Sequence, residues 1–234
     1  MVDNSDLIPA EALAARSPVR IKHEGAEYRA ARTRLLAEEI RLRRHIEQVA
    51  ELRRALPPGG LVEGDYRFEG EAGETDVLGL FGDKQTLLVY SYMFGPERQQ
   101  PCPMCTCMLG PVDQNAADIE QNIALAVVAR SPLDRLLAVK QERGWRGLKL
   151  YSDLNGNYSR DYLGLEADGS EAGVTNVFTR RDGAIRHFWM GEMTQETADP
   201  GQDQRDQPEL APLWNVLDLT PKGRGPRWYP KLRY

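Results

Sequence analysis

The stretch TLLVYSYMFGPERQQPCPMCTCM, residues 86–108, joins a run of apolar and aromatic residues to a cluster of cysteines. Its first part, 86–94, is almost free of polar residues, which is typical of a strand buried at the centre of a sheet. Its second part holds Cys102, Cys105 and Cys107, the only cysteines among the 234 residues of the chain. Such a cluster has three alternative explanations: a redox pair, a metal site, or inert thiols in a core.

The segments around this stretch alternate between strand and helix patterns. Predicted strands are 86–94, 123–130, 148–153 and a hairpin at 174–189, and predicted helices are 105–122 and 131–144. Ser131 is expected to cap the second helix, and Gly144 to end it. Strand, helix, strand, helix and a final hairpin predict an α/β domain with a mixed sheet.

An amphipathic helix precedes this domain. Between residues 24 and 56 an apolar residue recurs every seven positions, at Tyr28, Leu35, Leu42, Val49 and Leu56. This narrow seam either packs on the chain's own domain or forms a homodimer, because a seven-residue repeat suits a coiled-coil contact.

Prolines and glycines mark the boundary between this helix and the rest of the chain. The segment LPPGG at 56–60 cannot continue a helix. We therefore expect two parts, 1–57 and 58–234. The first contains an arm, predicted to be loosely packed up to about residue 24, and the long helix. The second contains the α/β domain and a C-terminal extension.

The composition excludes several classes of function. The formal net charge is -5, whereas nucleic-acid-binding domains usually gather a basic excess on one face. No stretch of about 18 apolar residues exists, so we expect no membrane span. The N-terminal residues lack a basic region followed by an apolar one, so we expect a protein of the reducing cytoplasm. Structural disulfides are rare there, and a close cysteine pair is more typical of catalysis or metal binding.

The C-x-x-C pair of Cys102 and Cys105 follows a predicted strand and begins a predicted helix, which is typical of an intracellular redox site. Unpaired N–H groups at a helix N-terminus favour a thiolate and can lower a cysteine pKa from about 8.5 to about 3.5–7.5. Pro103 has no N–H and suits the first helical turn. The pattern predicts that Cys102 attacks a disulfide and that Cys105, on the same helix face, resolves the mixed disulfide. Cys107 points away and is expected to be a small buried side chain or a spare thiol.

Zinc is the alternative for the same cysteines. Three thiols could bind it with a histidine as the fourth ligand. The chain has only His23, His45 and His187, none of them closely spaced with the cysteines, and it has no second C-x-x-C. Inert core cysteines are the third alternative, because free cysteine is often buried.

Motifs from about residue 25 to the end resemble one bacterial family. They are RRALPPGG, DYRF, SYMFGP, CPMCT, VVARSPLDR, RRDGAIRHFW, LWNVLDLTPKGRG and WYPKL. They are similar to the thioredoxin-like family known as domain of unknown function 899, also described as predicted dithiol-disulfide oxidoreductases. The resemblance implies a thioredoxin-like three-layer α/β fold with a mixed central sheet, here preceded by the long N-terminal helix.

Departures from well-studied thioredoxins bear on specificity. Those proteins carry an aromatic residue before the first cysteine, where this chain has Gln100-Pro101. They also carry a cis-proline before the strand that faces the C-x-x-C. The matching stretch here is Gly-Val-Thr-Asn at 173–176, in which Thr175 takes a similar location. Loss of that proline in thioredoxin relatives can let the cysteines capture metal.

Peroxiredoxins offer a further comparison. Their motif has a threonine three residues before the reactive cysteine, where this chain has Gln99. Arg98 or Arg130 would stabilise a thiolate if the fold brought either of them close.

The combined prediction is a cytoplasmic thiol–disulfide oxidoreductase with catalytic residues Cys102 and Cys105. Pro103 and Thr175 are the expected substrate-binding residues. The expected partner is a thiol or disulfide, in a protein or a small molecule, and we expect no cofactor, nucleic acid or membrane. The alternatives are a non-catalytic thioredoxin-like binding or scaffold protein, a metal-binding variant and a peroxiredoxin-like peroxidase.

Overall fold

The computed structural model describes residues 7–192, 194–201, 212–221 and 229–234. Contacts divide the chain into two compact units, Met1–Pro57 and Pro58–Tyr234. No helix in the described ranges is long and apolar enough to cross a membrane.

The first unit is a pair of helices, α1 (Ala10–Ala15) and α2 (Ala26–Arg54). The small side chains of Ala10 and Ala14 are buried with Ala37 and Ile40 of α2. The prediction of a loosely packed arm was therefore wrong for residues 10–15, because alanines let two helices approach closely. Residues 1–6 of that arm lie outside the described ranges.

One stripe of α2 remains uncovered within this unit. Large apolar side chains on it are between 51% and 69% exposed: Tyr28, Leu35, Leu42, Ile46 and Leu52. These are mostly the residues of the seven-residue repeat.

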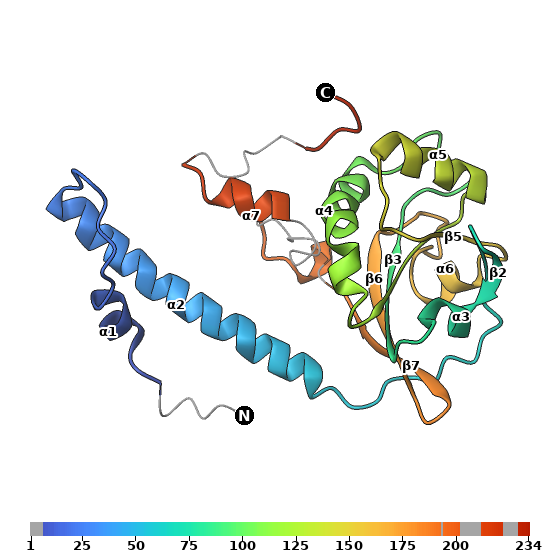
Figure 1. Ribbon diagram of the computed structural model, residues 1–234, viewed down its shortest axis with the longest axis horizontal. Helices are drawn as coiled ribbons and strands as arrows, with labels where there is room; N and C mark the ends of the chain where they lie inside the picture. The colour runs from blue at the N-terminus through green and yellow to red at the C-terminus, as the bar shows by residue number, and fades with distance from the viewer. Residues whose placement is uncertain (1–6, 193, 202–211, 222–228) are drawn as a thin grey trace. The chain divides into compact units, whose positions relative to one another are not determined.

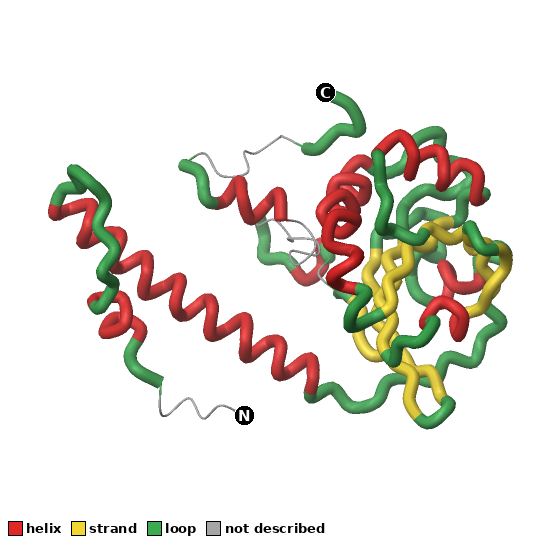
Figure 2. The backbone as a smooth tube through the Cα atoms, viewed as in Figure 1, coloured by secondary structure: helices red, strands yellow, loops and turns green. Residues whose placement is uncertain are grey.

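The second unit is built on one seven-stranded sheet (Figure 1, Figure 2). Its strands are β1 (Arg67–Gly70), β2 (Gly73–Asp76), β3 (Thr86–Ser91), β4 (Ala124–Ala129), β5 (Leu150–Asp153), β6 (Val174–Arg181) and β7 (Ala184–Met190). Its helices are α3 (Val77–Phe81), α4 (Pro103–Ile119), α5 (Leu133–Arg143), α6 (Asn157–Asp161), the 3-10 helix η2 (Gln195–Thr197) and α7 (Pro212–Asp218). The strand order is β2-β1-β5-β4-β3-β6-β7.

The middle of this sheet has the thioredoxin-like arrangement. β3 pairs in parallel with β4 after the crossover through α4, and β4 pairs in parallel with β5 after the crossover through α5. On its other side, β3 pairs antiparallel with β6, which forms a hairpin with β7. The predicted α/β fold class is therefore confirmed. The hairpin β1–β2 extends the sheet beyond β5. The short helix α3 follows this hairpin and was not predicted.

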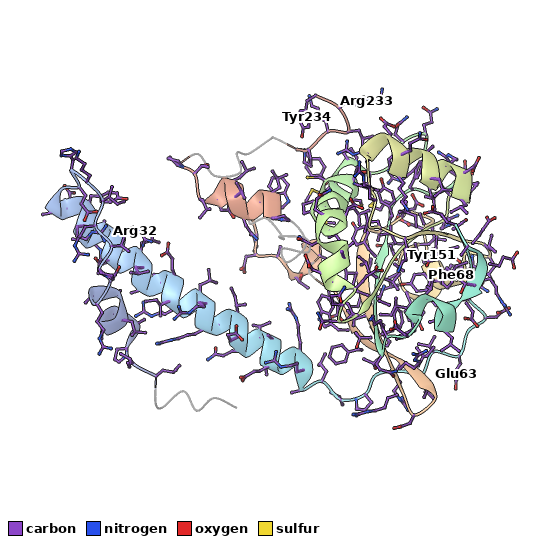
Figure 3. All side chains as sticks on the ribbon, in the orientation of Figure 1. Arg32, Glu63, Phe68, Tyr151, Arg233 and Tyr234 are labelled. Atoms are coloured by element: carbon purple, nitrogen blue, oxygen red, sulfur yellow. The ribbon has the colours of Figure 1, made fainter. Side chains whose placement is uncertain are left out.

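Helices cover both faces of the sheet, which gives three layers. One core lies under α4 and α5 and includes Tyr90, Val127 and Leu136. The other core lies under α3 and α6 and includes Phe68 and Phe81. Figure 3 labels Phe68, which is completely buried. All six residues of β4 are buried, because both of its faces are covered.

Two polar contacts fix α4 and the C-terminus. The Oδ1 atom of Asp113, a buried residue of α4, accepts hydrogen bonds from three successive backbone N–H groups, those of residues 146–148, at 2.8–3.0 Å. These bonds tie α4 to the segment that enters β5. Near the chain end, Arg233, which is labelled in Figure 3, pairs with Glu142 of α5 at 2.7 Å.

Candidate active site

Cys102 lies where the loop after β3 meets α4, at the carboxyl edge of the parallel strands. It is the N-cap residue of α4, and Pro103 takes the first helical position. The Cys102 sulfur accepts a hydrogen bond from the backbone N–H of Cys105 at 3.4 Å. The Cys102 carbonyl accepts bonds from the backbone N–H and hydroxyl of Thr106, at 3.0 and 2.8 Å. The cysteine side chain thus takes the capping role that a serine or aspartate usually has.

These surroundings make Cys102 acidic. The Cys105 thiol, which donates to the Cys102 sulfur, is the largest cause, and together with the backbone N–H groups of Met104 and Cys105 it lowers the pKa of Cys102 to about 6. Burial opposes this shift, and the positive charge of Arg98 supports it. Cys102 is half-buried, so its sulfur combines thiolate character with access to solvent.

Cys105 has the opposite character. It is 3% exposed. The hydrogen bond that its thiol donates to Cys102 raises its pKa well above the ordinary value, and burial raises it further. The two cysteines therefore divide into an acidic, accessible thiol and a protonated, buried one.

Cys107 does not join this pair. It is half-buried, and its pKa is raised by burial. All three cysteines are free.

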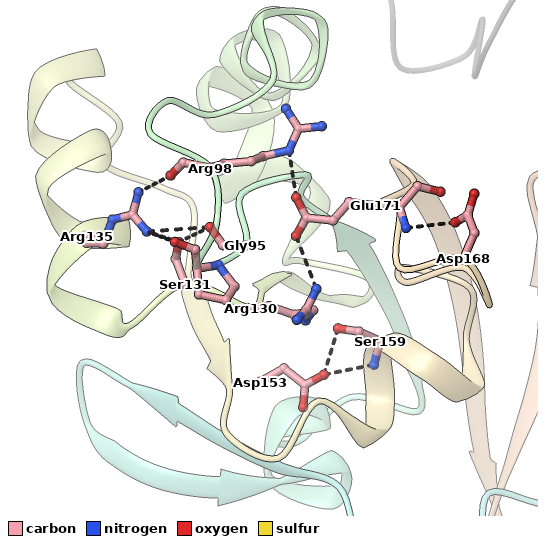
Figure 4. A network of polar contacts seen from close by, with 11 residues as sticks. Gly95, Arg98, Arg130, Ser131, Arg135, Asp153, Ser159, Asp168 and Glu171 are labelled. Atoms are coloured by element: carbon pink, nitrogen blue, oxygen red, sulfur yellow. Dashed lines mark hydrogen bonds and ion pairs between the residues drawn. The ribbon is translucent and has the colours of Figure 1, made fainter.

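The loop before Cys102 is held by Arg135 and Ser131 of the α5 segment (Figure 4). The Arg135 guanidinium donates to the carbonyls of Gly95, Pro96 and Arg98. It also lies over the Phe94 ring, 4.5 Å from the centroid. One side chain thus fixes several carbonyls of the loop that delivers Cys102.

Glu171 joins the same loop to the strand ends (Figure 4). Its carboxylate lies 2.7 Å from Arg98 and 3.8 Å from Arg130, and its side chain is 10% exposed. Gly95 leaves the space for it, since a Cβ there would lie 2.1 Å from the Glu171 carboxylate. Sequence reasoning singled out Arg98 and Arg130 but missed Glu171, which has no motif and lies 73 residues from Arg98.

Thr175 and Gly173 take different places beside the pair. Thr175 pairs with Tyr90 across β3 and β6 and is 3% exposed. Gly173 precedes β6, and an ideal Cβ on it would lie 3.1 Å from the Cys105 sulfur. Gly173 therefore lies close to the Cys105 sulfur, and substrate contact by Thr175 stays a prediction. The described residues contain no cis peptide bond.

The arrangement of the side chains that could ligate a metal gives little support for a metal site. Within the described ranges, no group of three or more His, Cys, Asp and Glu side chains is placed to hold an ion. The ring of His187 is instead hydrogen-bonded to Asn176 at 2.9 Å.

Comparison with known proteins identifies one matching family. A family model described as "Bacterial protein of unknown function (DUF899)" matches residues 18–234. No curated protein matches the chain.

Similar solved structures are peroxiredoxins. A 1-Cys peroxiredoxin of Plasmodium falciparum is 11% identical, with 69% of this chain and 99% of that chain covered and a TM-score of 0.48. A yeast mitochondrial 1-Cys peroxiredoxin is 14% identical, with 75% and 84% covered and a TM-score of 0.45. A PrxQ mutant of Xylella fastidiosa is 11% identical, with 58% and 84% covered and a TM-score of 0.45. The assignment of the fold rests on the strand order given above.

Proposed function

We propose that this chain, which belongs to the bacterial protein family DUF899, catalyses thiol–disulfide exchange with Cys102 as nucleophile and Cys105 as resolving thiol. The proposal rests on the difference in acidity and burial between the two cysteines. Cys102 has a pKa of about 6 and is half-buried, whereas Cys105 is buried and has a raised pKa. A nucleophile has to be ionised and accessible, and a resolving thiol has to wait until the mixed disulfide forms.

The reaction follows from this arrangement. The Cys102 thiolate attacks one sulfur of a substrate disulfide, forms a mixed disulfide and releases the other half as a thiolate, which takes a proton from solvent. Cys105 then loses its proton and attacks the Cys102 sulfur. The products are a Cys102–Cys105 disulfide and the second substrate thiol. The substrate disulfide is reduced to two thiols, and the protein dithiol supplies the two electrons and is oxidised to a disulfide.

Substrate approaches from the carboxyl edge of the sheet in this proposal. We expect the substrate to contact Pro103 and the backbone beside Gly173 and Thr175. The substrate is a disulfide of a protein or a small molecule. We place the reaction in the cytoplasm, where thiols are kept reduced.

A glutathione redox titration tests the proposal. Protein equilibrated at each ratio of reduced to oxidised glutathione is alkylated, and peptide masses report the state of each cysteine. We expect Cys102 and Cys105 to be oxidised together while Cys107 remains a thiol. The Cys102→Ser variant should have no disulfide-reductase activity, and Cys107→Ser, the matched control, should keep it. Absence of a Cys102–Cys105 disulfide at every ratio would favour the scaffold or metal-binding alternative.

Peroxide reduction by the same pair is a second candidate. The observation that favours it is a low-pKa thiolate at Cys102 supported by the charge of Arg98. Cys102 would attack the peroxide, release an alcohol or water and become a sulfenic acid, and Cys105 would condense with it to a disulfide and water. Gln99 stands where peroxiredoxins have threonine. Single-turnover rates with hydrogen peroxide and with a disulfide decide between the two substrates.

We also propose that the uncovered stripe of α2 forms a homodimer. Tyr28, Leu35 and Leu42 lie seven residues apart, and each is more than half exposed. A second copy of the same stripe would cover them, as in a coiled coil. We expect a dimer by light scattering at micromolar concentration and a monomer for the double variant Leu35→Lys, Leu42→Lys. Arg34→Ala, on an exposed position of the same helix, is the control. A monomeric wild-type protein would end this proposal.

A further inference from the structure

The hydroxyl of Tyr90 is buried and has no hydrogen-bond partner of normal geometry among the described residues. Tyr90 lies in β3, on the face covered by α4, and is 2% exposed. Its Oη atom makes no hydrogen bond of normal geometry with any described residue. A buried hydroxyl without a partner destabilises the folded state, so its retention calls for an explanation. Burial on this face does not prevent pairing, because the nearby Tyr92 hydroxyl meets the Thr106 hydroxyl at 2.7 Å.

Tyr90 shares a small space with the resolving cysteine. An ideal Cβ on Gly173 would lie 2.9 Å from the Tyr90 hydroxyl oxygen and 3.1 Å from the Cys105 sulfur. The two atoms therefore face the same space, which Gly173 leaves open by having no side chain. The next nearest atom to that Cβ is the Met93 sulfur, at 3.6 Å, which does not ionise.

We infer that Tyr90 is a positioning residue for the resolving step, whose hydroxyl donates a hydrogen bond to the Cys105 sulfur as that sulfur ionises. This inference rests on the proposed thiol–disulfide exchange. It assigns to this hydroxyl a bond that strengthens as Cys105 becomes a thiolate.

The step balances within the proposed reaction. Cys105 gives its proton to solvent, and its sulfur attacks Cys102 of the mixed disulfide. The Cys102–substrate bond breaks, and the substrate sulfur leaves as a thiolate. Tyr90 keeps its own proton throughout and only stabilises the charge on Cys105.

The electrostatics of the pair agree with this role. Hydrogen bonding to Cys102 and burial raise the pKa of Cys105, whereas the Tyr90 hydroxyl lowers it. Burial raises the pKa of Tyr90 itself, so its hydroxyl stays protonated and able to donate.

A single-turnover reaction with 5,5′-dithiobis(2-nitrobenzoate) separates the two steps. Attack by Cys102 releases a first thionitrobenzoate at a rate that depends on reagent concentration. Attack by Cys105 on the mixed disulfide releases a second thionitrobenzoate, at a rate that is independent of reagent concentration. All proteins carry Cys107→Ala, so that only the pair reacts. The rate of each phase is measured across pH.

We expect Tyr90→Phe to leave the first phase unchanged and to slow the second about tenfold at pH 7. The pH midpoint of the second phase should rise by about one unit, as for the loss of one hydrogen bond to a charged group. Thermal stability should not fall, because the variant removes an unpartnered hydroxyl and keeps the ring. Tyr158→Phe is the matched control. The Tyr158 hydroxyl is equally buried and unpartnered among the described residues, but it lies in the core on the other face. The Tyr158→Phe variant should change the rate of neither phase.

Each outcome decides the inference. An unchanged second phase in Tyr90→Phe overturns it and leaves the exchange reaction intact. Equal slowing in Tyr158→Phe also overturns it, because the effect would then be general. If the wild-type protein released only one equivalent of thionitrobenzoate, both the exchange reaction and the role of Tyr90 would be contradicted. Should Tyr90→Phe not fold, Gly173→Ala places a methyl group in the shared space, and we expect the same slow second phase.

Discussion

The acidity of Cys102 depends on its neighbour Cys105, and replacing that neighbour tests the site directly. The hydrogen bond from the Cys105 thiol is the largest cause of the low pKa of Cys102. Cys105→Ala removes this donor, whereas Cys105→Ser keeps an O–H donor of similar shape. The backbone N–H at position 105 is present in both variants.

The expected magnitude follows from the strength of that bond. With a pKa of about 6 instead of the ordinary 9.0, Cys102 is about 90% thiolate at pH 7 rather than about 1%. A hydrogen bond to a charged group contributes about 1.5–3 kcal/mol, equivalent to about one to two pKa units. Cys105→Ala should therefore bring the thiolate fraction at pH 7 down to about 10–50%. In the Cys105→Ser variant, the pKa of Cys102 should stay within about half a unit of its wild-type value.

The assay is the pH dependence of alkylation by iodoacetamide, followed by mass spectrometry of the Cys102 peptide. The midpoint of the profile gives the pKa. The plateau rate is a poor measure, because thiolate nucleophilicity itself falls as the pKa falls. Reduced protein is used throughout, so that no disulfide competes.

Two results would refute the reasoning. A Cys105→Ala midpoint equal to that of the wild type would show that the helix N-terminus alone sets the acidity. A wild-type midpoint above pH 8 would show that Cys102 is an ordinary thiol. The proposed difference in acidity between Cys102 and Cys105 would then be wrong.

Other perturbations test the supports of the site. Asp113→Ala leaves three backbone N–H groups, one of them in the buried residue Leu148, without their acceptor. It should lower the free energy of unfolding in urea by about 3–5 kcal/mol, whereas the exposed Asp118→Ala should change it by less than about 0.5 kcal/mol. Gly95→Ala brings a methyl group within 2.1 Å of the Glu171 carboxylate, and it should destabilise the protein by about 1–3 kcal/mol. Gly60→Ala, which meets nothing within 4 Å, should be neutral in the same melts. The pKa of Cys102 is lower in the folded state, so stability should rise between about pH 6 and pH 9 and fall as pH drops through this range. Reduced Cys102→Ser should lose that rise, and an unchanged pH profile would count against the assigned pKa.

Sequence patterns predicted the central elements well, because these elements are encoded locally. The run 86–94 produced β3 at Thr86–Ser91, and Pro103 marks the first residue of α4. The hairpin predicted around residues 181–183 joins β6 and β7. The short helices α3 and α6 were missed, because five residues are too few for a helical period to show.

The supports of the cysteine pair could not be predicted in the same way. Glu171 meets Arg98 across 73 residues, and Arg135 meets the carbonyl of Arg98 across 37. Only the order of the strands brings these segments together. Tyr90 and Tyr92 are two residues apart in the run 86–94, as expected of side chains on one face, but nothing in the run says which face α4 covers.

The hairpin β1–β2 also changes how the sheet ends. Without it, β5 would present its outer edge to solvent, whereas Phe68 and Glu69 of β1 pair with that edge. The new edge is β2, with the sequence Gly-Glu-Thr-Asp. Asp76 ends it after four residues by capping α3 through the N–H of Gly79 at 2.8 Å. A strand from a neighbouring molecule would meet two carboxylates on a very short edge, so this side of the sheet resists growth into aggregates.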